Sequence, residues 1–116
     1  MSAVHTELAG GRWRAFSLVE QLANVGSEIE RAIKGSKKDR LEYFTNAFYR
    51  GLELLDLTIA DSRHRHRLRE LTRLREVLLD YFLGPNEFGS SDLAWRRYFH
   101  AFGTAAALER ERHFVS

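Results

Sequence analysis

Four stretches of this 116-residue chain repeat their apolar residues every three or four positions. That spacing lines apolar side chains along one face of an α-helix, whereas a strand with one buried face needs strict alternation. No alternating run rich in β-branched residues and bounded by turns occurs in the sequence, so strands have no candidate. The stretches cover residues 13–33, a segment ending near residue 60, residues 63–83, and a segment that follows residues 90–92.

Short breaks separate the four stretches. Lys34-Gly35-Ser36 interrupts the first pattern, and Ser36 with Asp39 is expected to begin the second helix. Asp61-Ser62 is expected to cap the third helix, Gly84-Pro85-Asn86 to end it, and residues 90–92 to cap the fourth.

Helices of about 20 residues joined by connections this short pack as antiparallel neighbours. We therefore predict an all-α protein, an antiparallel up-down four-helix bundle over residues 12–116. Residues 1–11 end in two glycines, show no periodicity, and are expected to form a flexible N-terminal tail.

Composition limits the class of protein. The chain has the length of one domain and no cysteine, which removes disulfides and thiolate ligands together. No apolar run approaches the roughly 20 residues of a membrane span, and the first residues lack the basic and apolar regions of a signal peptide. These features predict a cytoplasmic protein without a membrane partner.

The second helix is apolar over an unusually wide arc. Besides a main seam that runs from Leu41 to Ile59, it carries a second row about 120° away at roughly 100° per residue. That row consists of Tyr43, Ala47 and Leu54. A helix of this kind suggests a subunit contact, so these three residues are the predicted interface of a homo-oligomer.

Residues 63–75, RHRHRLRELTRLR, hold six arginines and two histidines against one acid, Glu70. Arg65, Arg69 and Arg73 follow one another at four-residue spacing and would share one helix face. Such a stripe can follow the phosphates of a nucleic acid, although it can equally be a solvated face partly paired with glutamates. The candidate nucleic-acid-binding residues are Arg63, Arg65, Arg69 and Arg73, extended by Arg96 and Arg97 if these converge on the same surface.

Residues 95–102, WRRYFHAF, mix arginines with aromatic residues, as a base-stacking surface would. The spacing of Trp95, Phe99 and Phe102 follows the helix seam, so we expect these rings to pack in the core.

Sequence patterns for metal binding or catalysis are missing. No Glu-x-x-His motif of the kind that binds di-iron centres in helical bundles is present, and His64 and His66 are two positions apart, which would turn them to different sides of a helix. The chain also lacks Gly-x-Ser-x-Gly and glycine-rich phosphate loops. We therefore expect no catalytic residues, no metal site and no cofactor, and predict that the protein is not an enzyme.

Residues 21–55 resemble the small bacterial four-helix-bundle proteins first noticed as products of ribosomal RNA intervening sequences. The resemblance rests on Ala23-Asn24, Glu28, the turn Ser36-Lys37-Lys38, and the set Phe44, Ala47, Leu52, Glu53 and Leu54. Relatives of that family include the accessory variability determinant of diversity-generating retroelements, a basic pentameric bundle that binds nucleic acid and a reverse transcriptase. The resemblance implies a ring-forming bundle, a pentamer, with an RNA-linked or scaffolding role.

The strings LELLDLTIAD and RLRELTRLREVLLDYF also resemble a group of uncharacterised small prokaryotic helical proteins. The leading hypothesis is thus a non-enzymatic, oligomeric bundle that binds RNA or a nucleoprotein partner through the face spanning residues 63–75. The alternative is a protein-interaction or assembly module whose arginines only solvate it.

Overall fold

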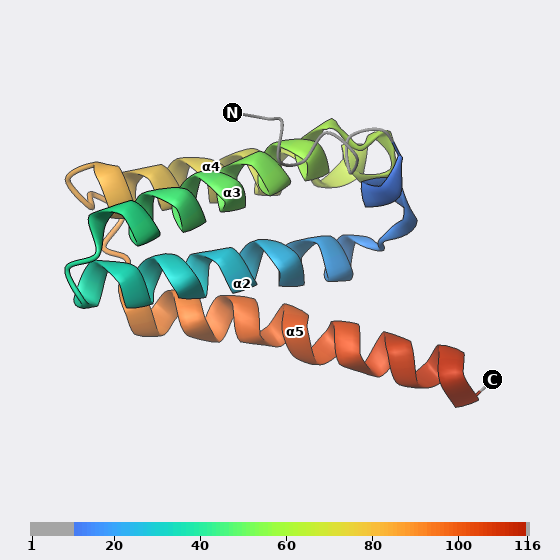
Figure 1. The fold of residues 1–116 in the computed structure, drawn as a ribbon. Coiled ribbons are helices and arrows are strands. Elements are labelled where there is room, and N and C mark those ends of the chain that lie inside the picture. Colours follow the sequence, from blue (N-terminus) through green and yellow to red (C-terminus); the bar gives the residue numbers. More distant parts are fainter. Residues whose placement is uncertain (1–10, 116) are drawn as a thin grey trace.

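A computed structural model describes residues 11–115 of the chain, with side chains described as far as residue 112. It confirms the all-α class: within these residues there are four α-helices, two 3-10 segments and no strand (Figure 1). In chain order the elements are η2 (Arg12–Ala15), α2 (Leu18–Lys37), α3 (Leu41–Ala60), η3 (Ser62–Arg67), α4 (Leu68–Leu83) and α5 (Asp92–Val115). Of the predicted N-terminal tail, residues 1–10 lie outside the described part.

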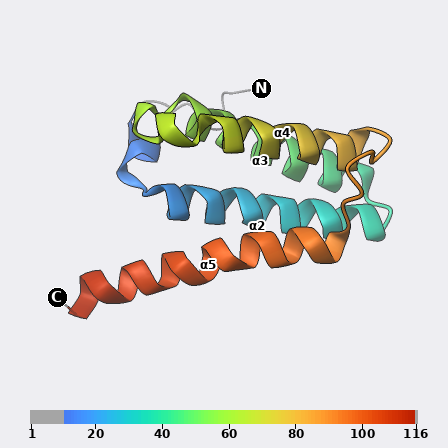
Figure 2. The ribbon, with the colours of Figure 1, turned by 180° about the vertical axis from the view of Figure 1, so that it is seen from behind.

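The helices form the predicted antiparallel bundle, with α2 at its centre. Helix α2 lies between α3 and α5, and α4 packs on α3 (Figures 1 and 2). Two contacts fix the antiparallel alignment of α2 and α5. At one end Lys37 Nζ lies 3.4 Å from Asp92 Oδ2, and at the other the Ser17 hydroxyl donates to Glu109 Oε1 over 2.7 Å. Beyond that point α5 extends past the start of α2 (Figure 1).

Helix α2 starts later than its apolar pattern suggests. The Glu20 amide donates to Ser17 Oγ over 3.2 Å, and the Ser17 amide donates to Glu20 Oε1 over 3.0 Å. This reciprocal capping box satisfies two amides at the start of the helix and sets its first residue at Leu18. The preceding residues, which sequence periodicity placed in the same helix, form the separate 3-10 turn η2.

The predicted break after residue 33 is wrong. Gly35 and Ser36 lie inside α2, which continues to Lys37, and the Ser36 hydroxyl donates to the Ile33 carbonyl instead of capping α3. The chain reverses at Asp39, whose φ of 52° is in the left-handed region that aspartate tolerates at such turns. Helix α3 then begins at Leu41 without a side-chain cap.

One contiguous core joins the four seams. The predicted rings Trp95 and Phe99 are buried in it, as expected, and Phe102 is half-buried. Three leucines at the starts of helices are exposed instead, at 75%, 42% and 58%: Leu41, Leu68 and Leu93. Each lies at the first or second position of its helix, where neighbouring helices cover less of the surface.

The second apolar row of α3 is largely covered within the chain. Ala47 and Leu54 are 4% and 5% exposed and belong to the common core, whereas Tyr43 is 43% exposed. The wide apolar arc arises because α3 packs against both α2 and α4 and also against the Trp13 turn, whose indole N–H donates to Thr58 on α3. The assignment of Ala47 and Leu54 to a subunit interface is therefore corrected, and only Tyr43 remains on the surface.

Candidate nucleic-acid interface

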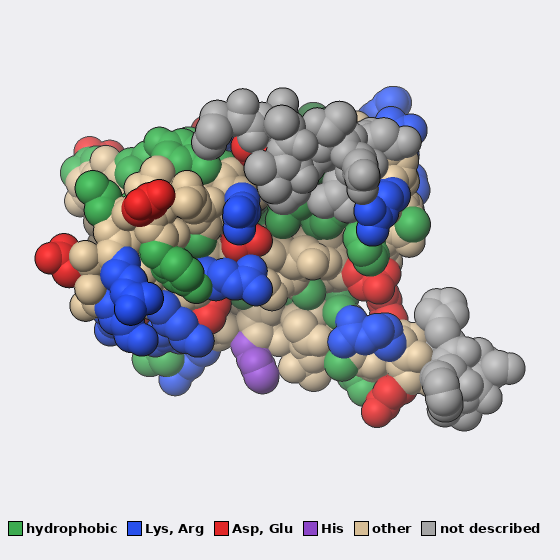
Figure 3. Space-filling model, viewed as in Figure 1, with side chains coloured by type: hydrophobic (Ala, Val, Ile, Leu, Met, Phe, Trp, Pro, Cys, Tyr) green, Lys and Arg blue, Asp and Glu red, His purple; other side chains and the backbone are tan. Residues whose placement is uncertain are grey.

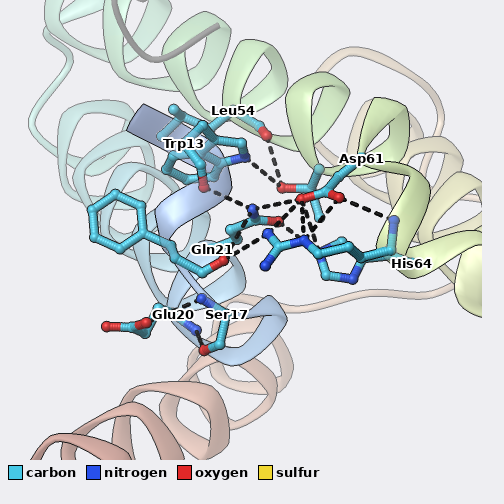
Figure 4. Close-up of polar contacts among 10 residues, drawn as sticks. Trp13, Ser17, Glu20, Gln21, Leu54, Asp61 and His64 are labelled. Carbon is cyan, nitrogen blue, oxygen red and sulfur yellow. Dashed lines mark hydrogen bonds and ion pairs between the residues drawn. The ribbon is translucent and has the colours of Figure 1, made fainter. Parts of the chain in front are cut away.

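A buried polar cluster anchors the corner from which the arginine-rich segment departs (Figure 4). Gln21 on α2 is fully buried and donates through Nε2 to the Trp13 carbonyl over 3.0 Å and to Asp61 Oδ2 over 3.2 Å. Its Oε1 lies 3.0 Å from His64 Nε2. An amide oxygen only accepts hydrogen bonds, so His64 is the donor through Nε2–H. The cluster ties η2, α2 and η3 together.

Arg63 completes this cluster, and its guanidinium binds within it. Its guanidinium lies 2.6 Å from Asp61 Oδ2 and donates to the Phe16 carbonyl over 2.9 Å. The Arg63 guanidinium, followed by the Gln21 amide, holds the pKa of Asp61 well below its usual value, and burial lowers the pKa of His64. Because Arg63 neutralises a buried carboxylate, its charge is already used within the fold, and a role for it in nucleic-acid binding stays a prediction.

The remaining arginines of residues 63–75 fall into two groups. Arg67 pairs with Glu70 over 3.1 Å, and Arg75 pairs with Asp56 of α3 over 2.7 Å. Among the described residues, Arg65, Arg69 and Arg73 have no carboxylate partner. We refer to these three as the arginine face. They are the three residues that the four-residue spacing selected in the sequence.

The backbone changes how the arginine face is built. Arg65 lies in η3 and not in a continuous helix, because the chain has non-helical dihedral angles at His64 and α4 begins only at Leu68. Arg69 and Arg73 do share one side of α4, one turn apart. The predicted single helical stripe is therefore a pair of arginines on α4 preceded by a third on a 3-10 turn.

Phe88 adds an aromatic ring for which the sequence pattern predicts no role. The guanidinium carbon of Arg73 lies 4.6 Å above the centre of this ring, within the range of a cation–π contact. The loop that carries Phe88 is held to α4, since Asp80 accepts hydrogen bonds from the amides of Glu87 and Phe88 at 2.9 and 3.1 Å. Phe88 is nevertheless 47% exposed. The sequence marked this segment only as a loop.

Arg96 does not extend the arginine face. It donates two hydrogen bonds to Glu30 on α2, at 2.9 and 3.0 Å, and so turns toward α2, whereas the arginine face is on α4 and η3. Arg97 is exposed at the next position of α5. Arg96 therefore does not converge with Arg63–Arg75 on one surface, contrary to the sequence prediction.

Among the residues that the structure describes, no group of three histidines or acids is placed to hold a metal ion. None of the described helices combines the length and apolar character needed to cross a membrane. Comparison with protein-family models, with curated proteins and with solved structures gave no match. The resemblance of residues 21–55 to the intervening-sequence proteins stays a prediction.

Proposed function

We propose that this chain is a non-enzymatic binding protein that holds single-stranded RNA, free or as part of a nucleoprotein, on its arginine face. The observation that carries the proposal is the division of charge along residues 63–75. Local acids neutralise Arg63, Arg67 and Arg75, while Arg65, Arg69 and Arg73 have no carboxylate partner in the described part of the chain. Guanidinium groups without such partners are available to phosphates, and each contact releases counterions from the nucleic acid.

The Arg73–Phe88 pair supports a preference for single strands. An exposed ring beside a guanidinium offers a surface on which an unpaired base can stack, and a duplex hides the faces of its bases. Arg69, one turn away on α4, would contact the neighbouring phosphate. The arginine face would then supply most of the affinity and Phe88 the discrimination between single and double strands.

Binding through the arginine face should depend measurably on salt concentration. Three phosphates neutralised on a single strand predict a slope of about −2 for the logarithm of the binding constant against the logarithm of salt concentration. Affinity should therefore fall about 20-fold between roughly 50 and 200 mM salt.

Fluorescence anisotropy of a labelled oligouridylate tests this prediction. In the triple variant Arg65→Glu, Arg69→Glu, Arg73→Glu, both the affinity and the salt slope should collapse. A control with the same change of net charge replaces three exposed cations elsewhere by Glu, namely Arg14, Lys38 and Arg50. Equal losses in the two triple variants would show that only net charge matters, and the proposal would be wrong.

Phe88→Ala tests the stacking step separately. Removing a stacked ring should weaken oligouridylate binding by about 1 to 3 kcal/mol and leave the salt slope unchanged, since no phosphate contact is lost. Binding of an RNA duplex should not respond to the substitution. If Phe88→Ala leaves oligouridylate affinity intact, or if wild type prefers the duplex, base stacking at Phe88 is excluded.

We retain a homo-oligomer in the cytoplasm as part of the proposal. The family resemblance, which implies a pentamer, supports the oligomer. The absence of cysteine supports the cytoplasm. The alternative of a pure assembly module has less support than the sequence suggested, because Ala47 and Leu54 are covered within one chain. Light scattering at high micromolar concentration measures the state directly. A monomer under those conditions would remove both the pentamer and the assembly alternative.

A further inference from the structure

A second surface, distinct from the arginine face, is hollowed between α2 and α5. The cleft there has a volume of about 530 Å³ and is bordered by both helices. A further hollow of about 420 Å³ continues it toward the start of α2, and Ala23, Ser27 and Gly103 line both. A volume of this size lies within the range of small-molecule sites.

The floor of the cleft is apolar, and the space beside Gly103 on α5 is open. Ile29, Ile33 and Phe99 line it. At Gly26 the two helices come so close that an added Cβ would lie 2.6 Å from Phe99 Cβ, which closes the bottom. At Gly103, by contrast, an added Cβ would meet nothing within 4 Å. Gly103 on α5 therefore faces free space, whereas Gly26 on α2 allows the two helices to touch at the bottom of the cleft.

Cations predominate at the rim. Lys34, Arg31 and Arg96 line the cleft together with His100, and Glu30 is the acid among its lining residues; Arg31 also pairs with Glu28 over 3.1 Å. Arg96 and Lys34 share the Glu30 carboxylate, at 2.9 and 4.0 Å. Figure 3 views this side of the molecule and shows Lys and Arg side chains gathering over the C-terminal half of α2 and the start of α5. One acid between two cations leaves positive charge at the rim.

Trp95 gives a second indication of a ligand. Its side chain lines the cleft, is 6% exposed, and has an indole N–H with no acceptor among the described residues. The rings of Tyr98 and Phe99 pack against it at 6.0 Å between centroids. Buried donors in folded proteins nearly always have a partner, so the unpaired indole N–H of a residue that lines the cleft favours an acceptor from outside the chain.

We propose that the α2–α5 cleft binds an amphipathic organic anion, an apolar body that carries a carboxylate, sulfonate or phosphate group. The apolar body lies against Phe99 and the small residues Ala23 and Gly103, which also line the cleft. The acidic group lies at the rim beside Lys34 and Arg96, and an oxygen of the ligand accepts from the Trp95 indole N–H. This site is independent of the arginine face on α4 and of the proposed RNA binding.

Two probes with the same ring system separate the apolar and the ionic parts of the site. 8-Anilinonaphthalene-1-sulfonate is a flat aromatic anion, and N-phenyl-1-naphthylamine is the same compound without the sulfonate. Both report binding by fluorescence. The wild-type chain should bind the sulfonate at least tenfold more tightly than the neutral amine. Equal affinities, or no binding of the sulfonate, would overturn the proposal.

Variants locate the bound probe. Gly103→Leu should fill the cleft and weaken both probes at least tenfold, whereas Ala101→Leu, at an exposed position of α5 outside the cleft, should change neither. Lys34→Gln with Arg96→Gln should weaken only the sulfonate, by at least fivefold. The charge-matched control Lys38→Gln with Arg50→Gln should have no effect.

Circular dichroism and thermal unfolding identify variants that fail to fold, and oligouridylate binding should be the same in Gly103→Leu as in wild type. If Gly103→Leu is folded and binds the sulfonate as wild type does, the probe lies elsewhere and the proposed site is wrong. Loss of sulfonate binding in the charge-matched control would equally contradict the proposal.

Discussion

Two glycines at the α2–α5 contact should respond oppositely to the same substitution. At Gly26 an added Cβ would lie 2.6 Å from Phe99 Cβ and 2.9 Å from its ring, where ordinary contacts begin at 3.4 Å, so α2 and α5 must separate by close to an ångström. Overpacking of this kind costs about 1 to 3 kcal/mol, and the better helix propensity of alanine returns about 1 kcal/mol. Gly26→Ala should thus lower the free energy of unfolding by up to about 2 kcal/mol.

Gly103→Ala is the matched control, because its Cβ would meet nothing within 4 Å. Only the propensity term acts there, so this variant should gain up to about 1 kcal/mol. For a chain of this length 1 kcal/mol corresponds to about 4 °C in melting temperature, which puts Gly26→Ala up to about 8 °C below wild type and Gly103→Ala up to about 4 °C above it. Thermal unfolding followed by circular dichroism measures both. If both variants melt above wild type, the close approach of α2 and α5 at Gly26 is refuted.

Three further predictions concern polar contacts. Ser17→Ala removes the capping box and the bond to α5 and should lower the free energy of unfolding in urea by about 1 kcal/mol, whereas Ser27→Ala on the exposed side of α2 should not. The pKa of Asp61 is depressed in the folded chain, so the ionised carboxylate contributes fully to folding stability above its usual pKa of 3.8, and this contribution is lost as the pH falls below that value. The stability advantage of wild type over Asp61→Asn should therefore shrink on acidification. A constant difference in stability down to pH 2 would contradict the Asp61 contacts. Burial, with the 2.5 Å hydrogen bond to Asp92, raises the pKa of Tyr81 to about 12. Tyr81→Phe should therefore remove the last step of the tyrosine absorbance titration at alkaline pH. If that last step is unchanged, the buried, hydrogen-bonded position of Tyr81 is excluded.

The fold could be predicted because each helix carries a long, regular seam. Residues such as Val25, Phe48 and Leu78 recur with helical spacing and are fully buried. Helix boundaries were less predictable because Gly35 has two possible meanings. The sequence pattern predicts a break there, but Gly35 lies within α2, where an added Cβ would come 2.9 Å from the backbone nitrogen of Phe44. A glycine required for close approach of two helices has the same sequence signature as one that ends a helix.

The arginine face could be predicted only in part. The spacing identified Arg65, Arg69 and Arg73, but which other arginines are neutralised depends on tertiary neighbours. Arg75 pairs with Asp56, a residue 19 positions earlier on another helix.

The buried polar cluster around Gln21 also depends on tertiary neighbours and could not be predicted. Gln21 and His64 are 43 positions apart, and neither lies in a motif. Long-range polar contacts of this kind follow from how the helices pack and have no local signal in the sequence.

The central claim is that the arginine face, with Phe88 beside it, holds single-stranded RNA. Titration of the isotopically labelled protein with oligouridylate, followed by amide chemical shifts, tests this claim residue by residue. We expect the shifted amides to cluster in η3, the first turns of α4 and the loop around Phe88, and the amide signals of the α2–α5 cleft to remain unshifted. Shifts confined to α2 and α5, or no shifts at low salt, would contradict it.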